Sequence, residues 1–328
     1  MSKTKPGCTP KRFQWLIPKD LAGAVRVEVW LKEYLPDFSR RIIRELFPGG
    51  GVRVNGRPVS KGFRVSPGDH LEVEIPGSWN SFPVPEQTPK PSVVFEDQTF
   101  LVMEKPGLVP SHPLSPFETG TLANALVSNW PQTIGVGNKP LEPGLVHRLD
   151  SGTSGLLVAA LEQGVWVQLK KDLAAKKWEK TYQALVEGVL QDPLTISLPL
   201  AHDSGDKRKM KVLRDPGGKY RGRVYRAITQ VQPLIKYNHH TLVDVKLITG
   251  VTHQIRAHLA FQGHPIAGDI LYGAKPAEKL GLPPGRFFLH ARHLSLPHPV
   301  TREPITCISE LPEDLREVLS RLESMPLT

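Results

Sequence analysis

The sequence predicts an α+β fold that is divided between a small and a large domain. Its 328 residues exceed the length of most single domains. A proline-rich stretch near residue 80 separates a short segment of helices and strands from a long one in which strand-like runs outnumber helices. We therefore expect a basic N-terminal arm over residues 1–24, a small α/β domain over 25–76, a linker over 77–91 and a large domain over 92–328.

The small domain is expected to begin with two short helices. In the first, Leu31, Tyr34 and Leu35 share one helical face. Ser39 is suited to cap the second, because a serine hydroxyl accepts a hydrogen bond from a free backbone N–H at a helix start. The second helix carries three arginines on its outward face: Arg40, Arg41 and Arg44.

Short strands should follow at 52–54, 64–65 and 71–75, where apolar residues alternate with polar ones. Turns at Asn55-Gly56 and Pro67-Gly68-Asp69 separate them. The prolines of 77–91 then make the linker semi-extended.

The large domain should open with a β-hairpin over 93–103, which turns at Asp97-Gln98. Further strands are predicted at 156–160, 182–186 and 241–245 from their apolar runs. A short amphipathic helix should lie near the C-terminus, where apolar residues have helical spacing: Leu315, Val318, Leu319 and Leu322.

The net charge of +10 and the pI near 9.6 predict an anionic partner. Nucleic acid suits both, because guanidinium and ammonium groups bind phosphate oxygens. Besides the arginines of the second helix, a basic run lies between predicted strands of the large domain, and we expect it to contact nucleic acid. That run includes Lys207, Arg208 and Lys209.

The sequence lacks the patterns of a secreted, membrane-spanning or metal-binding protein. The two cysteines, Cys8 and Cys307, can form neither a disulfide framework nor a zinc site alone. Apolar runs stay far below the ~20 residues of a membrane span, and the N-terminus leads into no apolar segment. His253 and His258 are five residues apart, which does not suit a pair of metal ligands on a helix, so we expect structural roles for them. The expected protein is cytoplasmic, uses no cofactor and has no membrane partner.

Two runs in the large domain carry the chemistry. In residues 146–155 a single carboxylate, Asp150, follows the basic pair His147-Arg148 and precedes a Gly/Thr/Ser turn that leads into an apolar strand. About a hundred residues later, residues 249–259 contain Arg256 within Thr252-His253-Gln254-Ile255-Arg256.

These runs, in this order, resemble the signatures of the RluA-type pseudouridine synthases. The resemblance extends from Lys105-Pro106-Gly107-Leu108 to Leu289-His290-Ala291 and beyond. Residues 25–76, with Val54-Asn55-Gly56 at their centre, resemble an S4-type RNA-binding domain. The family implies a mixed, largely antiparallel sheet with a central cleft. It also implies isomerisation of uridine to pseudouridine, which needs no cofactor or metal because no group is transferred and no redox change occurs.

The resemblance implies a role for each matching side chain. Asp150 would be the catalytic carboxylate, ionised at neutral pH because an ordinary Asp has a pKa near ~3.9. Arg256 would pair with Asp150 and keep it charged under the substrate. Tyr182 would stack on the uracil and could assist removal of the C5 proton. Arg148 would enter the gap left by the flipped base, with His147 beside it at the substrate.

Two positions depart from the family pattern: Ser151 and Val251 stand where basic residues are usual. The S4-like segment favours the large-subunit (23S-type) ribosomal RNA, free or in an assembling subunit, as substrate. Transfer RNA with the same chemistry, a non-catalytic ribosome-assembly factor and a glycosidase remain alternatives. The glycosidase reading would require a second acid near Asp150. A monomer is favoured.

Overall fold

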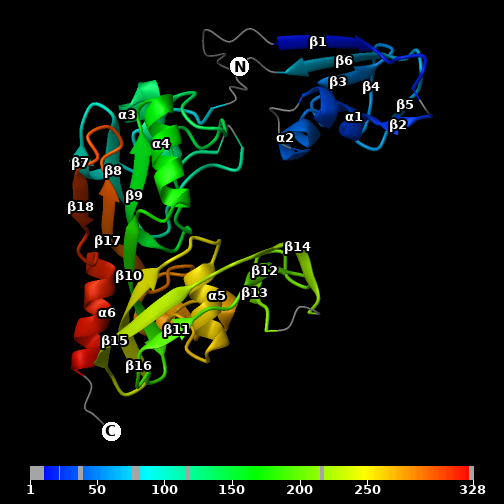
Figure 1. Cartoon of the computed structure of the whole chain (residues 1–328). Helices are drawn as coiled ribbons and strands as arrows, with labels where there is room; N and C mark the ends of the chain where they lie inside the picture. Colours follow the sequence, from blue (N-terminus) through cyan, green and yellow to red (C-terminus); the bar gives the residue numbers. More distant parts are fainter. Residues whose placement is uncertain are drawn as a thin grey trace. The chain divides into compact units, whose positions relative to one another are not determined.

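The computed structural model describes residues 11–21, 23–35, 40–75, 82–115, 118–214 and 218–324. The chain forms two compact units (Figure 1). The first comprises residues 1–84 with 113–119 and 139–142, and the second comprises 85–112, 120–138 and 143–328. Ser39, expected as a helix cap, and Cys8 lie outside the described residues.

The N-terminal unit contains a four-stranded sheet in the order β1-β6-β3-β4 and a separate pair, β2 and β5. Its elements are β1 (Lys11–Leu16), β2 (Val25–Arg26), α1 (Val27–Tyr34), α2 (Arg40–Glu45), β3 (Val52–Val54), β4 (Arg57–Pro58), β5 (Arg64–Val65) and β6 (His70–Ile75). Apolar residues of both helices and of the strands form one core, in which Val27, Leu31, Val52 and Leu71 are fully buried. The helix–helix–strand order predicted from the sequence is therefore present.

The segment expected to be a loose basic arm differs in the structure. Residues Lys11–Leu16 form β1, which pairs antiparallel with β6 along its whole length. The alternation of Phe13 and Trp15 with polar residues explains the strand, because successive side chains of a strand point to opposite faces. Phe13 and Trp15 pack against the core, and the edge of β6 is paired instead of open.

The large unit is built on one nine-stranded sheet in the order β11-β15-β16-β10-β17-β9-β8-β7, with β18 pairing with β17. Its strands are β7 (Ser92–Glu96), β8 (Phe100–Lys105), β9 (Ser154–Ala160), β10 (Glu179–Glu187), β11 (Leu194–Ile196), β15 (Thr229–Lys236), β16 (His240–Leu247), β17 (Leu289–Pro297) and β18 (Pro304–Ile308). The strands predicted near 93, 100, 156, 182 and 241 are all in it. The α+β class and the largely antiparallel mixed sheet are thus confirmed.

One pair of neighbouring strands in this sheet is parallel. It joins β17 to β9, with Ala291 opposite Gly155, and every other pair is antiparallel. On its other side Ala291 is opposite Tyr182 of β10. Gly155 has a φ of 108°, and a Cβ there would collide with the backbone of Ala291, so only glycine allows this junction.

Helices cover both faces of the sheet. They are α3 (Leu122–Asn129), α4 (Gln163–Ala174), α5 (Gln254–Phe261) and α6 (Glu313–Glu323). Apolar residues of α3 and α5 belong to one core cluster together with Tyr182 and Leu149, whereas α4 and α6 pack in two others. The predicted terminal helix is α6, which buries Leu315 and Val318. Short 3₁₀ turns lie at η1 (Pro131–Thr133), η2 (Ile270–Tyr272) and η3 (Ala277–Leu280).

A separate three-stranded sheet projects from the large unit between β11 and β15 (Figure 1). It consists of β12 (Leu200–Asp203), β13 (Met210–Val212) and β14 (Tyr220–Tyr225) in the order β13-β12-β14. The basic run of residues 207–209 forms the turn between β12 and β13. No helix in the described part of the chain is long and apolar enough to cross a membrane.

Candidate active site

Asp150 and Arg256 meet although they are separated by 106 residues in the sequence. Arg256 Nη1 donates a hydrogen bond of 2.9 Å to Asp150 Oδ2. Asp150 stands four residues before β9, and Arg256 lies in the first turn of α5. The Arg256 side chain is 7% exposed and that of Asp150 is 28% exposed, so the carboxylate is accessible while its partner is covered.

The loop that carries Asp150 is fixed by hydrogen bonds on several sides. Ser111 Oγ donates to the carbonyl of Leu149 and accepts from the N–H of the same residue. Lys105 Nζ, buried at the end of β8, donates to the carbonyl of Ser151 at 3.1 Å. Ser151 Oγ in turn donates to the carbonyl of Leu108. Ser151, which stands where the family pattern has a basic residue, therefore forms a hydrogen bond within the protein.

Arg286 holds the turn that follows Asp150. It is 1% exposed, and its guanidinium donates to the carbonyl of Gly152, to Ser154 Oγ and to Asp314 of α6. Gly152 has room only for a hydrogen, because a Cβ there would collide with Phe287. Close packing at Gly152 and the Arg286 hydrogen bonds together fix the backbone beside the carboxylate.

Lys105 is the second cation beside this loop. Burial and the charge of Arg286 lower the pKa of Lys105 to about 7, although the charge of Asp150 opposes this shift. Its Nζ nevertheless donates to three carbonyls, those of Pro106, Val109 and Ser151. Three acceptors match the three N–H groups of an ammonium ion.

Asp269 and two aromatic rings hold Arg256 in position. Asp269 accepts from Nε at 2.6 Å and from Nη2 at 2.9 Å, and its side chain is 1% exposed. The guanidinium carbon lies 5.0 Å from the Tyr272 ring centre and 4.5 Å from that of Phe287. Although burial opposes it, the hydrogen bonds and charges of Asp269 and Asp150 raise the pKa of Arg256 above its ordinary value. Arg256 is therefore a fixed cation.

Tyr182 enters the site from β10 and is 7% exposed. Burial, followed by the nearby Asp150 carboxylate, raises the pKa of Tyr182 above its ordinary value. The side chain is thus a neutral phenol at neutral pH. A flat neutral ring beside a carboxylate is suited to stack on a base.

His253 and Tyr272 connect the site to the small projecting sheet. His253 Nε2 lies 3.7 Å from Asp150 Oδ2, and its Nδ1 lies 3.0 Å from the Tyr272 hydroxyl. The same hydroxyl accepts from the backbone N–H of Met210 in β13. Burial lowers the pKa of His253, although the charge of Asp150 opposes this shift. The start of β13 is therefore hydrogen-bonded to a ring that stacks on Arg256.

Arg148 and His147, two and three residues before Asp150, lie in different environments. Arg148 is exposed, and its Nη1 lies 3.3 Å from His112 Nε2. His147 is half-buried, packs edge-on against Trp178 and accepts a hydrogen bond from Val158 N–H through Nε2. Burial, with the charges of Lys180 and Lys170, lowers the pKa of His147 to about 3. This packing differs from the substrate contact expected for His147.

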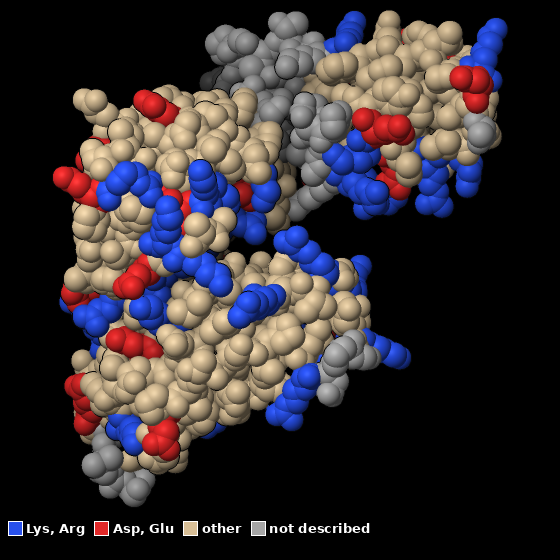
Figure 2. All heavy atoms as spheres, viewed as in Figure 1, with Lys and Arg blue, Asp and Glu red and all other residues tan. Residues whose placement is uncertain are grey.

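The basic residues predicted to contact RNA are on the surface, but several already have partners. Lys207 is exposed, Arg208 forms two hydrogen bonds with Asp206, and Lys209 Nζ lies 6.0 Å from the Tyr272 ring centre. In α2, Arg40 is exposed and Arg44 pairs with Glu28 at 2.9 Å. The side chain of Arg41 lies outside the described residues. Figure 2 shows lysine and arginine side chains gathered on the large unit in the region between α4 and α5.

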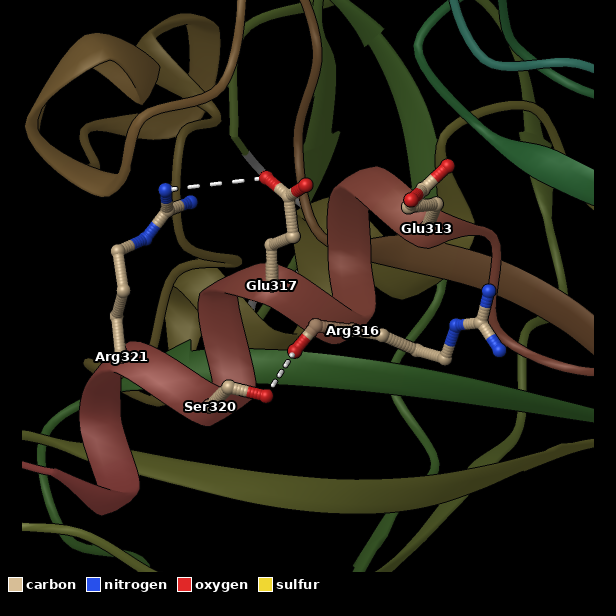
Figure 3. Close-up of a pocket in the computed structure, with 5 residues that line it drawn as sticks. All are labelled: Glu313, Arg316, Glu317, Ser320 and Arg321. Atoms are coloured by element: carbon tan, nitrogen blue, oxygen red, sulfur yellow. Dashed lines mark hydrogen bonds and ion pairs between the residues drawn. The ribbon is translucent and has the colours of Figure 1, made fainter.

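A surface pocket of about 400 Å³ lies elsewhere, on α6 (Figure 3). Its lining consists of Glu313, Arg316, Glu317, Ser320 and Arg321, and Arg321 pairs with Glu317 at 3.9 Å. Among the described residues, none of these five forms a hydrogen bond or an ion pair with Asp150, Tyr182 or Arg256. Among the described residues, no group of three or more His, Cys, Asp or Glu side chains is arranged to hold a metal ion.

Sequence reasoning singled out Asp150, Tyr182 and Arg256 but gave no role to Asp269, Tyr272 and Arg286, which hold Arg256 and the Asp150 loop in the structure. Asp269 and Tyr272 follow the second run closely, yet an aspartate and a tyrosine near a turn have many ordinary uses. Arg286 lies in Pro283-Pro284-Gly285-Arg286, which reads as a surface turn, and nothing in that pattern indicates a buried cation.

Comparison with known proteins gives one consistent result. The family model described as RNA pseudouridylate synthase matches residues 99–261, and the S4 domain model matches residues 25–71. The ribosomal large subunit pseudouridine synthase D of Neisseria meningitidis is 33% identical, in an alignment that covers 96% of this chain and 84% of the relative. An RNA pseudouridine synthase of Bacillus subtilis is 34% identical over 90% of this chain and 94% of its own length. The structure of human RNA pseudouridylate synthase domain containing 4 aligns with a TM-score of 0.55 at 27% identity, over 72% of this chain and 94% of that one.

Proposed function

The chain belongs to the RNA pseudouridine synthases, a family of isomerases, and from this premise we propose that Asp150 converts specific uridines of large-subunit ribosomal RNA into pseudouridine. The observation that carries the proposal is the contact of Arg256 with Asp150 at 2.9 Å, made by the two sequence runs typical of the family.

The reaction is an internal rearrangement. The bond between N1 and C1′ breaks, the uracil turns, and C5 bonds to C1′, while the C5 proton leaves and N1 takes up a proton. Atoms and electrons balance without an oxidant, reductant or donor. The protein must therefore supply an ionised carboxylate at the ribose, a means of holding the base, and an environment without bulk water.

Asp150 meets the first requirement. Its Oδ2 faces Arg256, whereas its Oδ1 accepts no hydrogen bond from the described residues and is available to the ribose. Attack on C1′ and removal of a ribose proton both need this free, charged oxygen. Because substrate binding would desolvate the carboxylate and favour its protonated form, the fixed Arg256 cation keeps it ionised.

Tyr182 would contact the flipped base, and Arg148 would fill the place that the base leaves in the RNA helix. Tyr182 is a neutral ring next to Asp150 and is proposed to stack on the flipped uracil. Arg148 is exposed two residues before Asp150 and is proposed to enter the gap left in the RNA. His147 is left out of this set because its ring packs on Trp178.

The choice of ribosomal RNA rests on two supports. An S4 domain occupies residues 25–71, and the relative from Neisseria meningitidis is named a ribosomal large subunit enzyme. Exposed cations on α2 and on the β12–β13 turn would bind the phosphates of structured RNA, either free or in an assembling subunit.

Release of tritium from RNA labelled at uridine C5 tests the proposal. The native protein should release tritium from large-subunit ribosomal RNA transcripts, and Asp150→Asn should bind the same RNA without release. Release by Asp150→Asn at the native rate would refute the role of Asp150. Release from transfer RNA with none from ribosomal RNA would refute the substrate while leaving the chemistry intact.

A further inference from the structure

Lys180 is a half-buried cation that has neither a hydrogen bond nor an ion pair among the described residues. Neighbouring lysines differ from it. Lys177 pairs with Asp172 at 3.1 Å, and Lys246 pairs with Glu179 at 3.3 Å. Burial lowers the pKa of Lys180 to about 8, which reflects the lost hydration of its ammonium group. An unpaired cation is costly to bury, so its retention requires a compensating function.

The position of Lys180 connects it to the active site. It lies on β10 two residues before Tyr182, and residues i and i+2 of a strand share a face about 7 Å apart. The pairing of β10 with β16 is regular through Thr181 and Tyr182, whereas the pairing with β17 shifts register between these two residues. Tyr182 itself lies close enough to Asp150 for the carboxylate to affect its pKa.

The ammonium group of Lys180 lies where the two sequence runs of the active site approach each other. A Cβ on Gly250, in the loop that leads into α5, would lie 3.3 Å from Lys180 Nζ. On the other side, burial and then the charge of Lys180 lower the pKa of His147, three residues before Asp150. Lys170, which donates to the carbonyl of Val146, adds a second positive charge beside His147. These two lysines therefore place positive charge beside His147, three residues before Asp150.

We infer that Lys180 binds a backbone phosphate of the RNA next to the flipped uridine. The inference rests on the proposed function, because an RNA chain then passes through the site and its phosphates are its anionic groups. Lys180 lies two residues from Tyr182 on β10, so an anion at Lys180 would belong to the RNA backbone near the base that stacks on Tyr182. Gly250 leaves the ammonium group open toward that position, since a larger residue there would crowd Nζ. The contact would anchor the target nucleotide while its base is turned.

The test compares full-length Lys180→Gln and Lys180→Arg with Lys279→Gln, an exposed lysine on η3 that gives the same change in charge. Binding of a large-subunit ribosomal RNA transcript is measured by filter retention in the Asp150→Asn background, where turnover does not interfere. Lys180→Gln should weaken binding about tenfold to a hundredfold and reduce the salt dependence by about one phosphate contact. Lys180→Arg should restore most of the affinity, and Lys279→Gln should leave it unchanged. Thermal melts check that each variant is folded.

A substrate with one neutral linkage locates the contact. Replacing the phosphate beside the target uridine with a methylphosphonate should weaken RNA binding by the protein that retains Lys180. The same replacement should not weaken RNA binding by Lys180→Gln any further. Equal losses in both proteins would overturn the inference. Tritium release by the protein with Asp150 intact reports separately on the reaction. Normal release with unaltered binding by Lys180→Gln would refute the phosphate contact alone. Absent release by the native protein, with binding still weakened in Lys180→Gln, would refute the reaction alone.

Discussion

Asp269 accepts two hydrogen bonds from Arg256, at 2.6 and 2.9 Å, and thereby turns the remaining Nη1 of the guanidinium toward Asp150. Asp269 is almost fully buried, so the pair is held away from water. The fixed planar guanidinium can then present one N–H group to the Asp150 carboxylate at a defined angle. Asp269 is therefore a positioning residue for Asp150 that acts through Arg256.

Asp269→Asn should reduce turnover while leaving RNA affinity near native. The amide keeps the shape but loses the charge, and a hydrogen bond to a charged group contributes about 1.5–3 kcal/mol, which corresponds to about a tenfold to a hundredfold slower reaction. The free energy of unfolding should fall as well, because a buried cation loses a partner. Single-turnover tritium release and urea denaturation measure the two effects. Asp192→Asn, an exposed control, should behave like the native protein, and native turnover by Asp269→Asn would rule out the positioning role.

Arg286→Lys should lower kcat with little change in KM for RNA. A lysine retains the charge, but its single ammonium group cannot reach Gly152, Ser154 and Asp314 in the fork geometry of a guanidinium. The turn after Asp150 would shift, and a small displacement of a catalytic group is costly in rate. Steady-state kinetics separate this effect from a loss of stability. Arg321→Lys, on the exposed side of α6, is the matched control. A drop in melting temperature without a change in kcat would restrict Arg286 to a structural role.

The residues proposed to act in catalysis can be predicted from the sequence more readily than the residues that hold them in position. Asp150 and Arg256 occur in distinctive runs, and Tyr182 lies on a strand that is apparent from its apolar pattern. Arg286 and Lys180 could not be predicted, because their environment is created by contacts with residues far away in the chain. For Arg286 these are Gly152 and Ser154, more than 130 residues earlier. Strand β1 had a visible alternation, but the surrounding basic residues and prolines obscured it.

Tyr182→Phe should separate stacking from proton transfer. The phenol has a raised pKa and makes no hydrogen bond to the described residues, so removal of the hydroxyl should change neither folding nor RNA affinity appreciably. If the hydroxyl assists departure of the C5 proton, turnover should fall at least tenfold. The native pH–rate profile between pH 6 and 9 should contain no ionisation of Tyr182, because its raised pKa lies above that range. Tyr182→Leu, which removes the ring, should also weaken binding of the flipped base. Native turnover by Tyr182→Phe would limit the residue to stacking.

Lys207→Gln should weaken RNA binding more than Arg208→Gln, although both residues are exposed on the same turn. Lys207 has no hydrogen bond or ion pair in the described part of the chain, whereas Asp206 accepts two hydrogen bonds from the Arg208 guanidinium. A cation already paired with a carboxylate releases fewer counterions from RNA. The slope of log affinity against log salt should therefore decrease by about 0.7–0.9 in Lys207→Gln and by less in Arg208→Gln. Asp206→Asn should free Arg208, raise the affinity and steepen the salt dependence. Equal slopes in all three variants and the native protein would show that this turn does not contact the RNA backbone.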